Sequence, residues 1–107
     1  MNTQSSETDF LIASCRESLR QVIDPEVGMN IVDLGLVYRL ELAAGTLQAD
    51  ITMTSPACPM GEQIMAEAEE ALLAALPPSV PVQLELVWNP PWSQERMSDI
   101  AKLHFGW

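Results

Sequence analysis

Apolar residues recur with helical spacing in two parts of this chain. The spacing predicts one helix that Thr8 or Asp9 can cap and that runs to about Ile23, and a second helix that begins near Pro59. The apolar positions are Leu11, Ile12, Cys15, Leu19, Val22 and Ile23 in the first helix, and Ile64, Met65, Ala68, Leu72, Ala75 and Leu76 in the second. Glutamates separate the apolar positions of the second helix, so one of its faces is suited to packing against a core.

Alternation of apolar and polar residues predicts three strands, over residues 36–42, 47–54 and 80–88. Residues 43–46 are short enough to join the first two strands as a hairpin. Because each strand has one apolar face, we expect a two-layer α/β (α+β) fold, with a small three-stranded mixed sheet and helices on one face. The element order is α-β-β-α-β-α, with a right-handed crossover through the second helix, and the pattern leaves the strand order open.

The length and composition of the chain suit a single folded unit. Its 107 residues are 48% hydrophobic, which is enough for one core. Residues 1–8 are polar and are expected to form a flexible N-terminus, so the domain is predicted to cover residues 9–107.

The C-terminal part of the chain leaves the last strand at a double proline. Ser93 is expected to cap a short final helix, which Gly106 would end. The residues expected to pack this tail onto the sheet are Trp92, Met97 and Leu103. The three tryptophans leave open an alternative, an aromatic surface that binds a partner.

The charge of the chain excludes some classes of partner. Fifteen acidic residues against five basic ones give a net charge of −10, which argues against nucleic acid and against an anionic membrane surface. A basic protein partner or a metal cation fits better. No apolar run is long enough to span a bilayer, and no secretory signal is visible. With only two cysteines, the protein is expected to be cytoplasmic, with reduced thiols.

The stretch from Thr54 to Gly61 joins a predicted strand to the second helix and contains Cys58. Pro59 suits the first helical position, because its missing N–H would have no partner there. Cys58 would then lie at or next to the N-cap, where the helix dipole favours a thiolate. These residues are compatible with a reactive or metal-binding thiol and with an ordinary turn cysteine. Cys15 lies on the apolar stripe of the first helix and is expected to be buried.

Two acidic positions accompany this stretch. Asp24-Pro25-Glu26 should end the first helix, because proline disfavours helical backbone at the residue before it. The two carboxylates could ligate a metal or assist proton transfer, or they could belong to a solvated turn. Asp33 is expected to cap the backbone of its own turn.

Four motifs in this order resemble one family over nearly the whole chain from about residue 10. They are Asp24-Pro25-Glu26, the run from Asn30 to Tyr38, the run from Thr52 to Pro59, and Pro90-Pro91-Trp92 with Met97. The series is similar to the metal–sulfur cluster assembly family, the SufT- and PaaD-like proteins. The resemblance implies an iron–sulfur cluster assembly type of domain and a role in the maturation of iron–sulfur proteins.

The resemblance also implies a site, a cargo and partners. The site residues would be Asp24, Glu26, Thr52, Thr54 and Cys58, with Cys58 as the thiolate that binds iron, a cluster or a carrier. Iron or an iron–sulfur cluster would be held transiently, and the partners would be iron–sulfur carrier or scaffold proteins and client apoproteins.

The chain departs from the common family pattern at three points. Ala57 replaces a usual glycine, and Asn89 replaces a usual aspartate, so no carboxylate role carries over there. The additional C-terminal cysteines of the PaaD branch are missing. A general maturation role is therefore favoured over the maturation of ring hydroxylases.

One cysteine in the loop cannot supply all ligands of a cluster. Either two chains bridge a cluster as a homodimer, or a partner supplies the remaining ligands. Two other classes of function stay open. The first is a thiol enzyme with Cys58 as nucleophile and an acid or His104 as base, although His104 is expected on the surface of the last helix. The second is an adaptor in which Cys58 never contacts metal.

Overall fold

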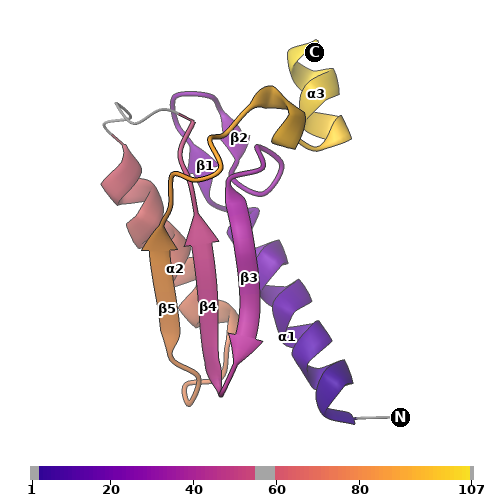
Figure 1. Ribbon diagram of the computed structural model, residues 1–107, viewed down its shortest axis with the longest axis vertical. Helices are drawn as coiled ribbons and strands as arrows, with labels where there is room; N and C mark the ends of the chain where they lie inside the picture. Colours follow the sequence, from indigo (N-terminus) through magenta and orange to yellow (C-terminus); the bar gives the residue numbers. More distant parts are fainter. Residues whose placement is uncertain (1–2, 55–59, 107) are drawn as a thin grey trace.

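The computed structural model describes residues 3–54 and 60–106, and these form three helices and a three-stranded sheet (Figure 1). The elements in chain order are α1 (Thr3–Leu19), β1 (Ile23–Asp24), β2 (Met29–Asn30), β3 (Val37–Ala43), β4 (Thr46–Ile51), α2 (Gly61–Ala75), β5 (Val82–Leu86), the 3₁₀ helix η1 (Gln94–Arg96) and α3 (Asp99–Phe105). The strand order is β3-β4-β5, with β3 antiparallel and β5 parallel to β4. Helices α1 and α2 lie on the same face of the sheet, which confirms the predicted fold class.

The core fills the space between these two helices and the sheet. Its fully buried side chains come from α1, the turn after β2, β4 and α2, and include Leu19, Leu34, Leu47, Ile51 and Leu72. Cys15 is also fully buried, as its position on the apolar stripe of the helix predicts. The two helices are joined directly, because the Ser18 hydroxyl donates to the Ala71 carbonyl at 2.8 Å.

Helix α1 differs from its prediction at both ends. It begins at Thr3 instead of Thr8 or Asp9, so residues 3–8 are helical, and it ends at Leu19 instead of near Ile23. Ile23 and Asp24 form the short strand β1, which pairs with β2 in a two-stranded sheet that the sequence did not predict. The backbone groups of Ile23 and Asp24 pair with β2, so they are not available to continue the helix.

Strand β3 contains a bulge at Tyr38. Val37 pairs with Ile51 and Arg39 pairs with Asp50, which leaves one extra residue in β3. The bulge interrupts the predicted alternation. Val37 packs against the core, while the Tyr38 hydroxyl donates to the Pro90 carbonyl at 2.8 Å.

The final helix begins later than expected. Ser98, and not Ser93, is the N-cap of α3, and its hydroxyl accepts a hydrogen bond from the Ala101 N–H at 3.2 Å. Ser93 precedes η1 without a side-chain cap, and extended backbone at Met97 separates η1 from α3. Gly106 ends α3 with a φ of 74°, as predicted.

The tail packs through fewer residues than predicted. Met97 and Ala101 are buried, and Trp92 and Phe105 pack against the core. Leu103 is 81% exposed, so its expected packing onto the sheet is wrong. Ala101 and Phe105 are one helical turn apart and occupy the inner face of α3, which turns Leu103 outwards.

Met97 and Leu103 provide a matched pair for a stability test. We expect Met97→Ala to lower the free energy of unfolding by about 2–5 kcal/mol, because it removes buried side-chain volume. Leu103→Ala should change it by less than about 0.5 kcal/mol, because the side chain is in solvent. Urea denaturation followed by circular dichroism measures both, and equal losses would contradict the packing described here.

Candidate functional site

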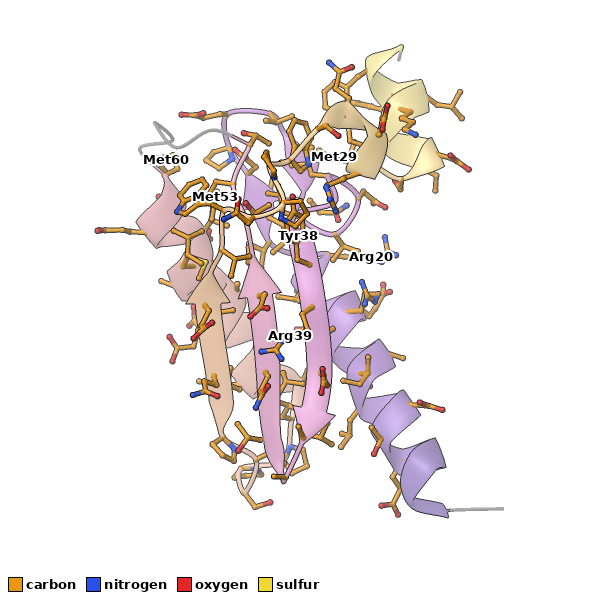
Figure 2. All side chains as sticks on the ribbon, in the orientation of Figure 1. Arg20, Met29, Tyr38, Arg39, Met53 and Met60 are labelled. Carbon is orange, nitrogen blue, oxygen red and sulfur yellow. The ribbon has the colours of Figure 1, made fainter. Side chains whose placement is uncertain are left out.

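The segment that contains Cys58 connects two points of the fold that lie close together. Residues 55–59 are outside the described residues, so the structure does not place Cys58. The chain enters the segment after Met53, at the end of β4, and leaves it at Met60, before α2; both labelled side chains lie at the same end of the molecule (Figure 2). A Cβ atom at Gly61 would lie 3.9 Å from the Met53 Cγ, so the two anchors of the segment are in contact range.

Helix α2 starts later than its prediction. Its first residue is Gly61 and its N-cap is Met60, whose carbonyl accepts a hydrogen bond from the Ile64 N–H at 2.9 Å. Met60 packs against the core at this helix start. The predicted positions of Pro59 as the first helical residue and of Cys58 at or next to the N-cap lie outside the described residues and stay predictions.

A cavity of about 400 Å³ lies at Met53 and Thr54, the last described residues before the segment. Its lining residues are Met53, Thr54, Trp88, Pro91 and Trp92. They follow β4 and β5, which are parallel neighbours, so the carboxyl ends of both strands meet at one edge of the sheet. Thr54, a predicted site residue, is half-buried and belongs to this wall. The other wall residues were not predicted as site residues, although Trp92 belongs to a motif of the family resemblance.

The cavity wall is held in place by contacts with the rest of the fold. The Trp92 Nε1–H donates to the Leu34 carbonyl at 2.6 Å, and Pro90 accepts the Tyr38 hydrogen bond described above. The guanidinium of Arg96 lies 4.5 Å from the centre of the Tyr38 ring. The aromatic wall is therefore fixed before any ligand arrives, which lowers the entropic cost of binding.

Thr52, the second predicted threonine, is a buried part of the sheet region. Its side chain is 1% exposed, and its N–H donates to the Leu36 carbonyl at 2.8 Å. Its Oγ1 has no hydrogen-bond partner among the described residues. An unsatisfied buried hydroxyl costs about 1–3 kcal/mol, so a partner for this atom would stabilise the folded state.

The two predicted carboxylates lie in different environments. Asp24 is fully buried, and its Oδ1 accepts the Glu26 N–H at 3.0 Å, as in a turn that its own side chain caps. Its Oδ2 is buried and has no partner in the described part of the chain. Glu26 is exposed to solvent. The interpretation as a turn therefore accounts for one oxygen of Asp24 and leaves the other available.

A metal site made by the described residues alone is not found. Residues 3–54 and 60–106 contain no group of three or more His, Cys, Asp or Glu side chains that could hold a metal ion. In the same described ranges, no helix has the length and apolar character needed to cross a membrane.

Asp33 is the centre of a polar cluster, not a cap of its own turn as predicted. Its Oδ2 accepts the Asn30 Nδ2–H at 2.7 Å, and its Oδ1 accepts Arg20 at 3.0 Å. Burial acts to raise the pKa of Asp33, but hydrogen bonds from Asn30, Ser98 and Arg20 and the Arg20 charge outweigh it, so the pKa lies below its ordinary value. The pairing with Arg20 had no signal in the sequence, because it depends on where α1 ends.

Gly35 allows the backbone of the tail to approach the turn that contains Asp33. Its φ is 78°, and a Cβ atom there would overlap with the backbone carbonyl of Arg96. The Ser98 N–H donates to the Asp33 carbonyl at 2.8 Å. The turn at residues 33–35 thus fixes the segment that leads from the cavity to α3.

The described residues define a small α+β domain with a buried Met53, a partly buried Met60 and a mainly apolar cavity lined by Met53, Thr54, Trp88, Pro91 and Trp92. A family model described as iron-sulfur cluster assembly protein matches residues 13–84. The chain belongs to this family, which supports a role in iron–sulfur cluster assembly or maturation.

Curated relatives and a solved structure agree with this membership. The chain is 43% identical to the Fe-S protein maturation auxiliary factor SufT of Staphylococcus aureus over 79% of this chain and 97% of that protein. It is 42% identical to the auxiliary factor YitW of Bacillus subtilis, over 83% of this chain and 87% of that protein. The crystal structure of a DUF59 domain of unknown function from Bacillus anthracis has 38% identity and a TM-score of 0.85, and the match covers 95% and 97% of the two chains.

The Asp33 cluster leads to a pH-dependent prediction. A carboxylate with a lowered pKa stabilises the folded state above its unfolded pKa of about 4, and this contribution is lost as the pH falls through the folded-state pKa. Asp33→Asn should lower the free energy of unfolding by about 1–3 kcal/mol at neutral pH. The difference from the unmodified protein should shrink below about pH 4.

Denaturation at several pH values measures this difference. Asp9→Asn serves as the matched control, because Asp9 is exposed, and it should have little effect at any pH. A difference for Asp33→Asn that stays constant down to strongly acidic pH would show that the charge of Asp33 is not what stabilises the cluster.

Proposed function

We propose that this chain is an accessory factor for the maturation of iron–sulfur proteins, in which Cys58 is a thiolate ligand for iron or a cluster. The iron or cluster is cargo that passes through the protein to client apoproteins, and is not a resident cofactor. Membership of the iron–sulfur cluster assembly family supports the general role, and the maturation factors named above support an accessory role instead of catalysis. The proposal keeps the protein in the reducing cytoplasm, where a free thiol persists.

The observation that carries the choice of Cys58 is the burial of the other cysteine. The sequence contains two cysteines, and Cys15 is 0% exposed within the core. Burial also raises the pKa of the Cys15 thiol, which disfavours the thiolate that a metal needs. Cys58 is therefore the thiol that we assign to the cargo.

The remaining ligands come from outside this chain. Iron–sulfur clusters are held by several thiolates, and one chain supplies one. A second copy of the chain or a carrier or scaffold protein would complete the set, which makes the bound state transient. In this proposal Glu26 provides a solvent-exposed carboxylate. Thr54, which directly precedes the segment in sequence, lines the cavity.

Two of the three buried polar atoms without a partner among the described residues fit the same proposal; the third, Asp50 Oδ1, is not part of it. Asp24 Oδ2 can accept a hydrogen bond, and Thr52 Oγ1 can donate or accept one. Both belong to the site that the family resemblance implies. We assign both atoms as hydrogen-bond partners of the backbone or of the ligands when iron or a cluster is bound.

Anaerobic reconstitution tests the role of Cys58. Addition of iron and sulfide should produce visible charge-transfer absorption in the unmodified protein and in Cys15→Ala, and Cys58→Ser should lose most of it. The same variants should be compared for activation of an iron–sulfur apoenzyme. If Cys58→Ser keeps full absorption and activation, the assignment is wrong. If the unmodified protein binds partners but never binds iron in any form, the protein is an adaptor.

A labelling experiment compares the two thiols directly. In the native, reduced protein an alkylating reagent should modify Cys58 well before Cys15, because packing shields Cys15 from the reagent. Unfolding should make both react, and bound iron should slow the modification of Cys58 alone. Mass spectrometry after brief alkylation gives the order, and earlier labelling of Cys15 would contradict it.

A further inference from the structure

Trp92 separates two neighbouring hollows on the surface. One is the apolar cavity described above, and the other, of about 490 Å³, is lined by Trp92, Ser93, Gln94 and Glu95. We propose that the two hollows form one groove, here called the tryptophan groove, which binds an extended segment of a partner protein. The segment carries an apolar or aromatic side chain close to a lysine or arginine. This inference rests on the proposed function only in that the partner then docks beside the Cys58 segment.

The apolar end of the tryptophan groove has the size and chemistry for one large apolar side chain. Its volume of about 400 Å³ lies within the usual range of small binding sites. Met53 is 2% exposed, so it lies deep, while Trp88 is 42% exposed and presents an aromatic surface to solvent. Exposed tryptophans in such positions are frequent hot spots of protein binding.

The other end of the tryptophan groove favours a cation. Glu95 is exposed there, and no lysine or arginine is among the described residues that line either hollow. The neighbouring Arg96 guanidinium stacks on the Tyr38 ring, which occupies it elsewhere. The net charge of −10 attracts a basic segment over a longer range.

The wall between the two hollows is rigid, which favours a peptide as the occupant. The hydrogen bond from Trp92 Nε1–H to the Leu34 carbonyl fixes the plane of the indole. Two hollows that share one fixed ring in their lining can accept two nearby side chains of an extended chain. Because the wall does not need to be ordered on binding, a short segment can gain useful affinity.

The experiment uses a phage-displayed library of random peptides selected on the full-length protein. We expect the recovered peptides to share an apolar or aromatic residue near a lysine or arginine. Trp88→Ala should weaken the consensus peptide by about tenfold. Glu95→Lys should weaken it by about threefold, as for a partly exposed ion pair. Glu85→Lys is the matched control, because Glu85 is exposed and lines neither hollow, and it should have a smaller effect than Glu95→Lys.

The outcomes separate this inference from the proposed function. Acidic consensus peptides, no enrichment, or equal effects of Glu95→Lys and Glu85→Lys would overturn the tryptophan groove. So would unchanged binding by a Trp88→Ala variant whose thermal unfolding matches that of the unmodified protein. Cys58→Ser should bind the consensus peptide normally. Loss of iron binding in that variant with normal peptide binding would support both conclusions. Iron binding by the unmodified protein, lost in Cys58→Ser, without peptide binding by either would remove only the tryptophan groove.

Discussion

The carboxylate of Asp33 joins parts of the chain that no strand or helix connects. It accepts hydrogen bonds from the end of α1 through Arg20 and from β2 through Asn30. The backbone carbonyl of the same residue binds Ser98, the cap of α3. Without this charge, Arg20 and Asn30 would lose a shared partner in a partly buried place, which costs more than a neutral hydrogen bond. The same turn holds the tail through the Asp33 carbonyl and the cavity wall through the Leu34 carbonyl, which accepts the Trp92 hydrogen bond.

Much of the fold follows from the periodicity of apolar residues. The two long helices, the hairpin and the crossover were all predictable, because each buries one face and the spacing of that face is visible in sequence. The end of α1, the bulge at Tyr38 and the cap at Ser98 were not predictable. Each depends on a pairing that the helical or strand pattern does not encode: the β1–β2 ladder, the register of β3 against β4, or the distant Asp33 carbonyl.

The candidate site was predictable only in part. Three of the predicted residues are buried or half-buried: Asp24, Thr52 and Thr54. Asp24 and Thr52 each have a buried polar atom with no hydrogen-bond partner among the described residues. The Glu26 side chain is exposed whereas Asp24 is buried, although the Glu26 N–H donates to the Asp24 carboxylate. The tryptophans were expected mainly to pack the tail, with a partner-binding aromatic surface as the alternative. The cavity wall around Trp92 could not be located from sequence, because it arises from parallel pairing of β4 and β5, which brings two strand ends together.

This parallel pairing has a consequence for the order in which the chain folds. The β3–β4 hairpin is local and can form early, whereas β5 joins β4 only after the whole of α2 has crossed the sheet. Met53 and Trp88 lie on the two sides of that late contact. The cavity therefore exists only in chains that have completed their longest-range pairing. A newly made or partly unfolded chain would carry the cysteine segment but not the surface beside it, so docking at that surface would select mature molecules.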